Sequence, residues 1–95
     1  MVKFIGIRTS VRRGKKFDAY FVFRGRQRVV PFGAAGMEDY TTHRDPRRQE
    51  RYVLRHEGRE NWNNPMTPGA LSRFILWSSP SLRQGIKNYR LHFGF

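Results

Sequence analysis

The second half of the sequence has three places where a helix-capping side chain is followed directly by proline. These pairs are Asp45-Pro46, Thr67-Pro68 and Ser79-Pro80. The side chains of Asp, Thr and Ser accept hydrogen bonds from the free backbone N–H groups at a helix start, and the fixed φ of proline suits the first helical position. Each pair therefore predicts the start of a helix, and the close spacing of the three starts predicts short helices.

Hydrophobic periodicity supports these three helices. After each start, apolar side chains recur at intervals of three and four residues, as on one face of a helix. They are Leu71, Phe74 and Ile75 in the second segment and Leu82, Ile86, Tyr89 and Phe93 in the third, and in the first segment Tyr52 and Val53 share one face with His56. We expect Gly58 just beyond the end of the first helix.

The first 32 residues have the features of strands instead. Residues 2–8, 17–23 and 27–32 are rich in β-branched and aromatic side chains, and turns at residues 10–16 and 24–26 separate them. In the second segment, one face would carry Phe17, Ala19, Phe21 and Phe23. A link of small residues, 33–36, then leads to the helices. The predicted fold is α+β in a single domain of residues 1–95: a small antiparallel β-meander (1–32) followed by three short α-helices (33–95).

The charge of the chain is large and unevenly distributed. The net charge is +12, from 19 Lys and Arg against seven Asp and Glu. Residues 1–35 hold nine cations and one acid, Asp18; residues 36–60 are balanced; residues 61–95 hold four cations and no acid. One acid cannot pair nine cations. Because 15 of the cations are arginines, whose planar fork suits phosphate, the first partner to consider is nucleic acid.

The candidate nucleic-acid contacts are cations in and beside the two turns. They are Arg8, Arg12, Arg13, Lys15, Lys16, Arg24, Arg26 and Arg28. In a meander the two turns lie at opposite ends, and strand pairing can align Arg8 and Arg28 on one face. We expect contacts to backbone phosphates, which do not read sequence. The interleaved rings of Phe17, Tyr20 and Phe23 suit the stacking of unpaired bases, and a role in the core explains them equally well.

The middle of the chain carries a dense set of polar and aromatic motifs. They are Asp39-Tyr40-Thr41, His43-Arg44-Asp45, Tyr52-Val53-Leu54-Arg55-His56, Glu60-Asn61-Trp62, Met66-Thr67-Pro68-Gly69, Ser72-Arg73-Phe74 and Leu76-Trp77. This combination resembles a family of short, basic, uncharacterised proteins encoded by giant nucleocytoplasmic DNA viruses. The likeness covers about residues 32–90, and Pro68 and Phe74 depart from a pattern that has alanine and tryptophan there. The resemblance implies a viral origin and a fold, but no reaction.

Three of the motif residues raise the question of catalysis. His43, Asp45 and His56 could form a metal or acid–base cluster, loosely as in a nuclease. Their positions are scattered, however, and no cysteine or suitably spaced second carboxylate accompanies them. We favour structural roles: Asp45 caps a helix, His56 packs and donates to a backbone carbonyl, and His43 braces the loop. The sequence therefore predicts no catalytic residue, no metal, no cofactor and no enzymatic activity.

These observations lead to a functional expectation with one alternative. We expect a non-enzymatic viral protein that binds nucleic acid, DNA in preference to RNA, and that acts in the virion or in the host cytoplasm or nucleus. The alternative is a structural virion protein, a minor capsid or internal component, that docks on other virion proteins or on acidic protein or membrane surfaces. No apolar run is long enough to span a membrane. We also expect residues 32–93, with Trp62 and Trp77, to carry the core while the basic turns carry the contacts.

Overall fold

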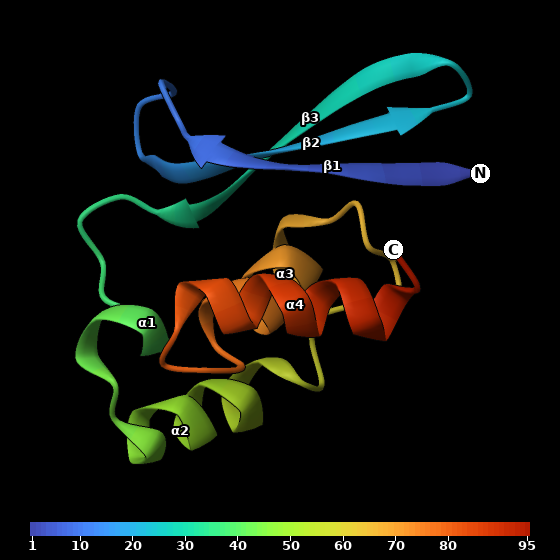
Figure 1. Cartoon of the computed structure of the whole chain (residues 1–95). Helices are drawn as coiled ribbons and strands as arrows, with labels where there is room; N and C mark the ends of the chain where they lie inside the picture. The colour runs from blue at the N-terminus through green and yellow to red at the C-terminus, as the bar shows by residue number, and fades with distance from the viewer.

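A three-stranded antiparallel sheet forms one layer of the protein, and helices cover one of its faces (Figure 1). The computed structural model describes all of residues 1–95. The strands β1 (Val2–Thr9), β2 (Lys15–Phe23) and β3 (Arg26–Ala34) follow one another in the sheet in chain order. The predicted meander is therefore confirmed, with strands slightly longer than the sequence indicated.

Short helices form the rest of the molecule. They are α1 (Tyr40–His43), α2 (Pro46–His56), α3 (Pro68–Leu71), the π-helix η1 (Ser72–Leu76) and α4 (Leu82–Phe93). Because η1 continues α3 without a break, the predicted second helix is one body that changes from α to π geometry. The α+β fold in one domain is as predicted, and α1 is a helical turn that the sequence pattern did not indicate.

Capping side chains start the helices, and two of the three predicted starts are confirmed. Asp45 accepts from Arg47 N, and Thr67 accepts from Ala70 N. The third start is wrong by two residues: Ser81 caps α4 by accepting from Gln84 N, and Pro80 precedes the helix instead of opening it. Ser79 is buried and accepts from Ser81 N, so it orders the turn before the helix.

The core lies between the inner face of the sheet and the helices. Opposed residues on paired strands share a face, so the pairs Phe4–Phe21 and Phe17–Phe32 place aromatic rings toward the helices. The buried cluster consists of Phe4, Ala19, Phe21, Phe32, Leu71, Ile75, Leu76 and Tyr89. The expectation that residues 32–93 alone carry the core is therefore wrong. The alternation of β1 and β2 creates an apolar face that has to be buried.

The two tryptophans differ in their environment. Trp77 is half-buried and packs against the core cluster, as predicted, whereas the prediction that Trp62 carries the core is wrong because Trp62 lies outside that cluster. The indole N–H of Trp62 donates to Glu60 Oε2 at 2.9 Å, and the guanidinium of Arg73 lies 5.3 Å from its ring centre. Trp62 thus belongs to a polar cluster beside the core.

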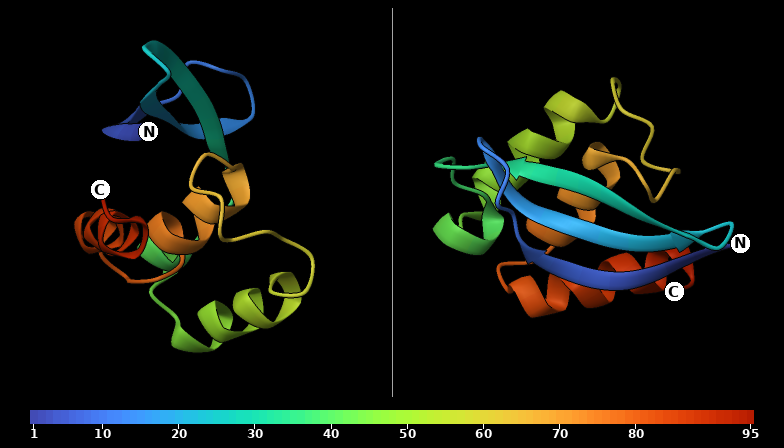
Figure 2. Two further views of the ribbon diagram at one scale, coloured as in Figure 1. Left: turned by 90° about the vertical axis from the view of Figure 1, so that its right-hand side faces the viewer. Right: turned by 90° about the horizontal axis from the view of Figure 1, so that it is seen from above.

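The helices α4 and η1 cross at very short range. A Cβ atom placed on Gly85 of α4 would lie only 2.1 Å from the carbonyl oxygen of Ile75 in η1. Glycine is therefore required at this crossing, because any other side chain would collide with backbone. By contrast, α2 lies farthest from the sheet, as an outer layer beyond α3 and α4 (Figure 2).

Candidate functional site

Few of the cations are neutralised within the fold. Only three of the 19 Lys and Arg side chains lie in an ion pair, and these are Arg12–Asp18, Lys16–Asp39 and Arg48–Glu38. The other sixteen have no carboxylate partner in the protein. The positive field that the composition indicates is therefore largely available to an external anion.

Two of the eight predicted contact residues have structural partners. Arg12 donates to Asp18 Oδ2 at 2.6 Å, and Ser10 Oγ donates to the other carboxylate oxygen at 2.8 Å. Asp18 is only 2 % exposed, so Arg12 compensates a buried charge. Lys16 donates to Asp39 Oδ2 at 2.5 Å and to the carbonyl of Met37 at 2.8 Å, which fixes the link after β3. The prediction that both cations are free for phosphate is wrong, because each has a buried acid within reach.

The other six predicted cations are exposed and lie in two groups. Arg13 and Lys15 are at the β1–β2 turn, and Arg24, Arg26 and Arg28 are at the opposite end of the sheet. Arg8, the last residue but one of β1, lies close to the first group, with its guanidinium 5.8 Å from the ring centre of Tyr20.

The separation of the two turns is as expected, but the alignment of Arg8 with Arg28 is wrong. Arg8 pairs with Asp18 and Arg28 pairs with Phe21. Asp18 and Phe21 are three residues apart on β2, so they point to opposite faces of the sheet.

The outer face of the sheet is not covered by any helix (Figures 1 and 2). A β-bulge between Phe4 and Gly6 shifts the register of β1 and leaves Ile5 55 % exposed. Beside the bulge is a hollow of about 400 Å³, lined by Ile5, Gly6, Ile7, Arg8, Tyr20, Val22 and Gln27. Of the three interleaved rings, only Tyr20 lies on this face. Phe17 packs with Phe32 on the inner face at 5.8 Å, which supports the core interpretation for that ring.

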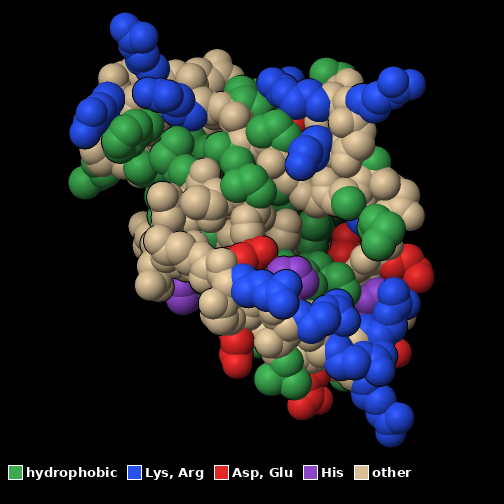
Figure 3. Space-filling model, turned by 180° about the vertical axis from the view of Figure 1, so that it is seen from behind, with side chains coloured by type: hydrophobic (Ala, Val, Ile, Leu, Met, Phe, Trp, Pro, Cys, Tyr) green, Lys and Arg blue, Asp and Glu red, His purple; other side chains and the backbone are tan.

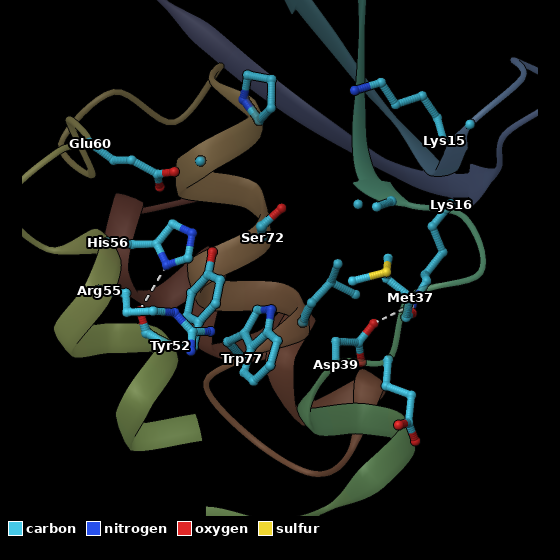
Figure 4. A pocket seen from close by; sticks show the side chains of 17 residues that line it. Lys15, Lys16, Met37, Asp39, Tyr52, Arg55, His56, Glu60, Ser72 and Trp77 are labelled. Atoms are coloured by element: carbon cyan, nitrogen blue, oxygen red, sulfur yellow. Dashed lines mark hydrogen bonds and ion pairs between the residues drawn. The ribbon is translucent and has the colours of Figure 1, made fainter. Parts of the chain in front are cut away.

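A second cavity, of about 440 Å³, lies below the end of β3, between the link that follows it and the helices α2 and α3 (Figure 4). One wall is a stack of three rings. The rings of Tyr52 and Trp77 are 4.2 Å apart and 2° from parallel, and the ring of His56 lies 4.1 Å from Tyr52 on its other side. His56 Nδ1 lies 2.8 Å from the carbonyl oxygen of Tyr52 and donates to it, so Nε2 is left as the acceptor. The predicted packed His56 is thus confirmed.

The polar atoms of this wall have no partner within the protein. Neither Tyr52 Oη, Ser72 Oγ nor Trp77 Nε1 forms a hydrogen bond to another residue, and Figure 4 shows these groups at the cavity. Tyr52 is only 7 % exposed. Burial raises the pKa of the Tyr52 phenol far above its ordinary value, and the charge of Glu60 raises it further, so the hydroxyl stays protonated. The buried side-chain atoms without a partner are His43 Nε2 and Arg73 Nε, so solvent reaches these three groups and they are open to a ligand.

Both acidic and basic side chains line the cavity. Glu60 lines it and lies so close to Gly69 that a Cβ there would be 2.6 Å from Glu60 Oε2. Lys15 from β2 and Arg55 from α2 also line it and are exposed. On the back of the molecule, Figure 3 shows Lys and Arg side chains above and below a hollow in which acidic and histidine side chains are visible.

The sequence patterns did not predict this cavity. A signal was present, however, because residues of six separate motifs meet here: Asp39, Tyr52, Arg55, His56, Glu60, Gly69, Ser72 and Trp77. Local patterns assign these motifs to elements of the fold and do not show that their side chains converge.

Arg73, from one of those motifs, is held among aromatic rings instead. Its guanidinium lies 5.3 Å from the ring centres of both Trp62 and Phe74. Burial lowers the pKa of Arg73, and its Nε has no partner in the protein. This arginine packs as part of the structure.

The remaining motif histidine and aspartate have the predicted structural roles. His43 Nδ1 accepts from the backbone N–H of Asp45 at 2.9 Å, and Asp45 caps α2. His43 also lies 5.3 Å from the ring of Trp77. No group of three His, Asp or Glu side chains is arranged to hold a metal ion.

Comparison with known proteins places this chain in a family. Residues 5–56, more than half of the sequence, match a family of unknown function, DUF5754. The chain belongs to this family. The DUF5754 region extends from β1 to the end of α2 and includes Tyr52 and His56 of the cavity, while Glu60, Ser72 and Trp77 lie beyond it. No curated protein and no solved structure matches the chain. None of its helices is long and apolar enough to cross a membrane.

Proposed function

We propose that this protein binds nucleic acid, without catalysis, through backbone phosphates on the open face and ends of its sheet. The observation that carries the proposal is that sixteen of 19 cations have no carboxylate partner. Free arginines in a field poor in acids favour a polyanionic partner, because phosphate groups can accept their paired N–H donors.

The dimensions of the sheet fit this role. A nine-residue strand is about 30 Å long, which corresponds to the rise of roughly nine base pairs of DNA. Arg13 and Lys15 lie at one end of this length, with Arg8 close to them, and Arg24 and Arg26 lie at the other end. Tyr20 adds an aromatic ring on the same face, where an unpaired base could stack on it. DNA is the expected partner, and binding to RNA should be measured for comparison.

The proposed setting is a giant DNA virus, with the protein acting in the virion or in the infected cell. This part of the proposal rests on the resemblance of the motifs from Asp39 to Trp77. A structural virion protein docked on acidic surfaces would use the same cations. We favour nucleic acid because Tyr20 and the hollow beside it offer a contact for bases in addition to charge.

A salt series with matched charge reversals tests the proposal. The double variant Arg13→Glu/Arg26→Glu changes one exposed cation at each end of the sheet, and Arg83→Glu/Lys87→Glu makes the same charge change on α4. Fluorescence anisotropy with DNA and RNA of unrelated sequences should show weaker binding for the sheet variant than for the α4 variant. For the sheet variant, the slope of the logarithm of the binding constant against the logarithm of the salt concentration should flatten by about 0.9 for each duplex-DNA phosphate that the variant no longer neutralises. Equally weakened binding in both variants would mean that only net charge matters and that the sheet does not bind the nucleic acid.

A further inference from the structure

The cavity beside Tyr52 and Trp77 has the features of a ligand site separate from the sheet face. We propose that it binds a single nucleotide, with the base in the cavity and the phosphate at its mouth. The volume of about 440 Å³ lies within the range of small-molecule pockets. The site does not depend on the proposed role of the sheet, and it can be tested without a polynucleotide.

The inner part of the cavity offers both donors and acceptors. Trp77 Nε1 is a donor, the hydroxyl groups of Tyr52 and Ser72 can donate or accept, and His56 Nε2 is an acceptor. Glu60 adds a carboxylate oxygen, Oε1, that no protein donor occupies. A nucleobase edge carries amine donors and ring-nitrogen or carbonyl acceptors, so it can satisfy this mixed set.

The charges define the orientation of the ligand. A phosphate group placed beside Glu60 would be repelled by its carboxylate, and the other exposed acid of the lining, Glu38, pairs with Arg48. At the mouth, Lys15 and Arg55 come from opposite layers and neither has an acidic partner. Phosphate is therefore favoured at the mouth and a neutral base inside.

The wall that would contact the base is already ordered. The ring of Tyr52 is held between His56 and Trp77, so the ring faces are occupied and the polar edges are left for the ligand. Glu60 is held by the indole N–H of Trp62 and lies against Gly69. A site whose polar groups are fixed in advance loses less conformational entropy when it binds.

Titration with adenosine, cytidine, guanosine and uridine monophosphates, followed by the indole ¹H–¹⁵N signals, tests the site. The Trp77 signal, assigned by its absence in Trp77→Phe, should shift with at least one mononucleotide. It should shift much less with inorganic phosphate or ribose 5-phosphate, which lack the base. Tyr52→Phe and Ser72→Ala each remove one hydroxyl group and should weaken binding by about 3- to 10-fold. Tyr40→Phe removes the hydroxyl group of a tyrosine that does not line the cavity and should leave mononucleotide binding unchanged.

The outcomes separate this inference from the proposed function and distinguish two sources of the nucleotide. If the ligand is an unpaired nucleotide of a strand, Ser72→Ala will also reduce the preference for single-stranded over duplex DNA. If it is a free mononucleotide, Ser72→Ala will leave DNA binding intact. The inference is overturned if no mononucleotide shifts the Trp77 signal at millimolar concentration, or if phosphate alone binds as tightly as the nucleotides. Neither result affects the charge-reversal test of the sheet.

Discussion

Arg12 and Arg13 are adjacent arginines with different roles, and their alanine variants should differ in stability. Arg12 compensates the carboxylate of Asp18, which is 2 % exposed, whereas Arg13 is exposed and has no partner. Arg12→Ala leaves the buried carboxylate with Ser10 as its remaining side-chain donor. Arg13→Ala removes only a solvated side chain.

The expected decrease in stability follows from the geometry. A hydrogen bond to a charged group contributes about 1.5–3 kcal/mol, and breaking a fully buried ion pair costs more. The Arg12 side chain is 48 % exposed, however, so solvent screens part of the interaction. We therefore expect Arg12→Ala to lower the free energy of unfolding by about 1–2 kcal/mol, near the low end of the range for a hydrogen bond to a charged group. For a domain of this size, that corresponds to a decrease in Tm of roughly 4–16 °C.

Thermal unfolding followed by far-UV circular dichroism measures the difference. Arg13→Ala should change stability by less than about 0.5 kcal/mol, as most surface substitutions do. Asp18→Asn completes a double-mutant cycle, and in that background Arg12→Ala should cost much less because the buried charge is gone. If the two arginine variants have the same Tm, or if the cost of Arg12→Ala is unchanged in Asp18→Asn, the reasoning about the buried pair is wrong.

Three further predictions concern stability and can be measured by the same unfolding experiment. Gly85→Ala should destabilise the protein by about 1–3 kcal/mol or more, because the new Cβ atom would collide with the Ile75 carbonyl. Gly58 has no atom within 4 Å of a Cβ placed there and has no positive φ, so Gly58→Ala should be neutral or slightly stabilising. Equal stability of the two variants would contradict the close crossing of α4 and η1. Trp77→Ala should cost about 3 kcal/mol and Trp62→Ala clearly less, since only Trp77 packs on the core. Burial also raises the pKa of the Tyr89 phenol, so folding favours the protonated phenol. The stability that this preference provides is complete below about pH 10 and is lost as the pH rises further. Tyr89→Phe should therefore reduce the loss of stability at alkaline pH.

The parts of the fold that depend on neighbouring residues could be predicted from the sequence. Strand alternation and the caps at Asp45 and Thr67 involve residues two or three positions apart, so local patterns reveal them. The pairing of Lys16 with Asp39 could not be predicted in this way. It joins residues 23 positions apart, and it depends on how the link after β3 returns to the sheet.

The candidate sites were less predictable from the sequence than the strands and helix caps. Composition identified a basic meander, but it could not show that Arg12 has a buried partner on β2. The cavity depends on Tyr52 of α2 meeting Ser72 and Trp77, which lie at the two ends of η1, and the periodicity of either segment alone does not show that they meet. The pattern Ser79-Pro80 predicted the cap two residues too early, and only the hydrogen bond from Gln84 N shows that Ser81 is the cap.

The position of α2 as an outer layer affects how the molecule opens. Tyr52 is the only buried residue of this helix, whereas the sheet and α4 contribute the fully buried side chains Phe21, Phe32 and Tyr89. Elements with little buried surface unfold locally at lower free energy than the core. The amide protons of α2 should therefore exchange with solvent faster than those of α4. Because α2 supplies one wall of the cavity, a ligand bound there should slow this exchange in proportion to its occupancy. Amide exchange in α2 thus links the opening of one helix to the filling of the site.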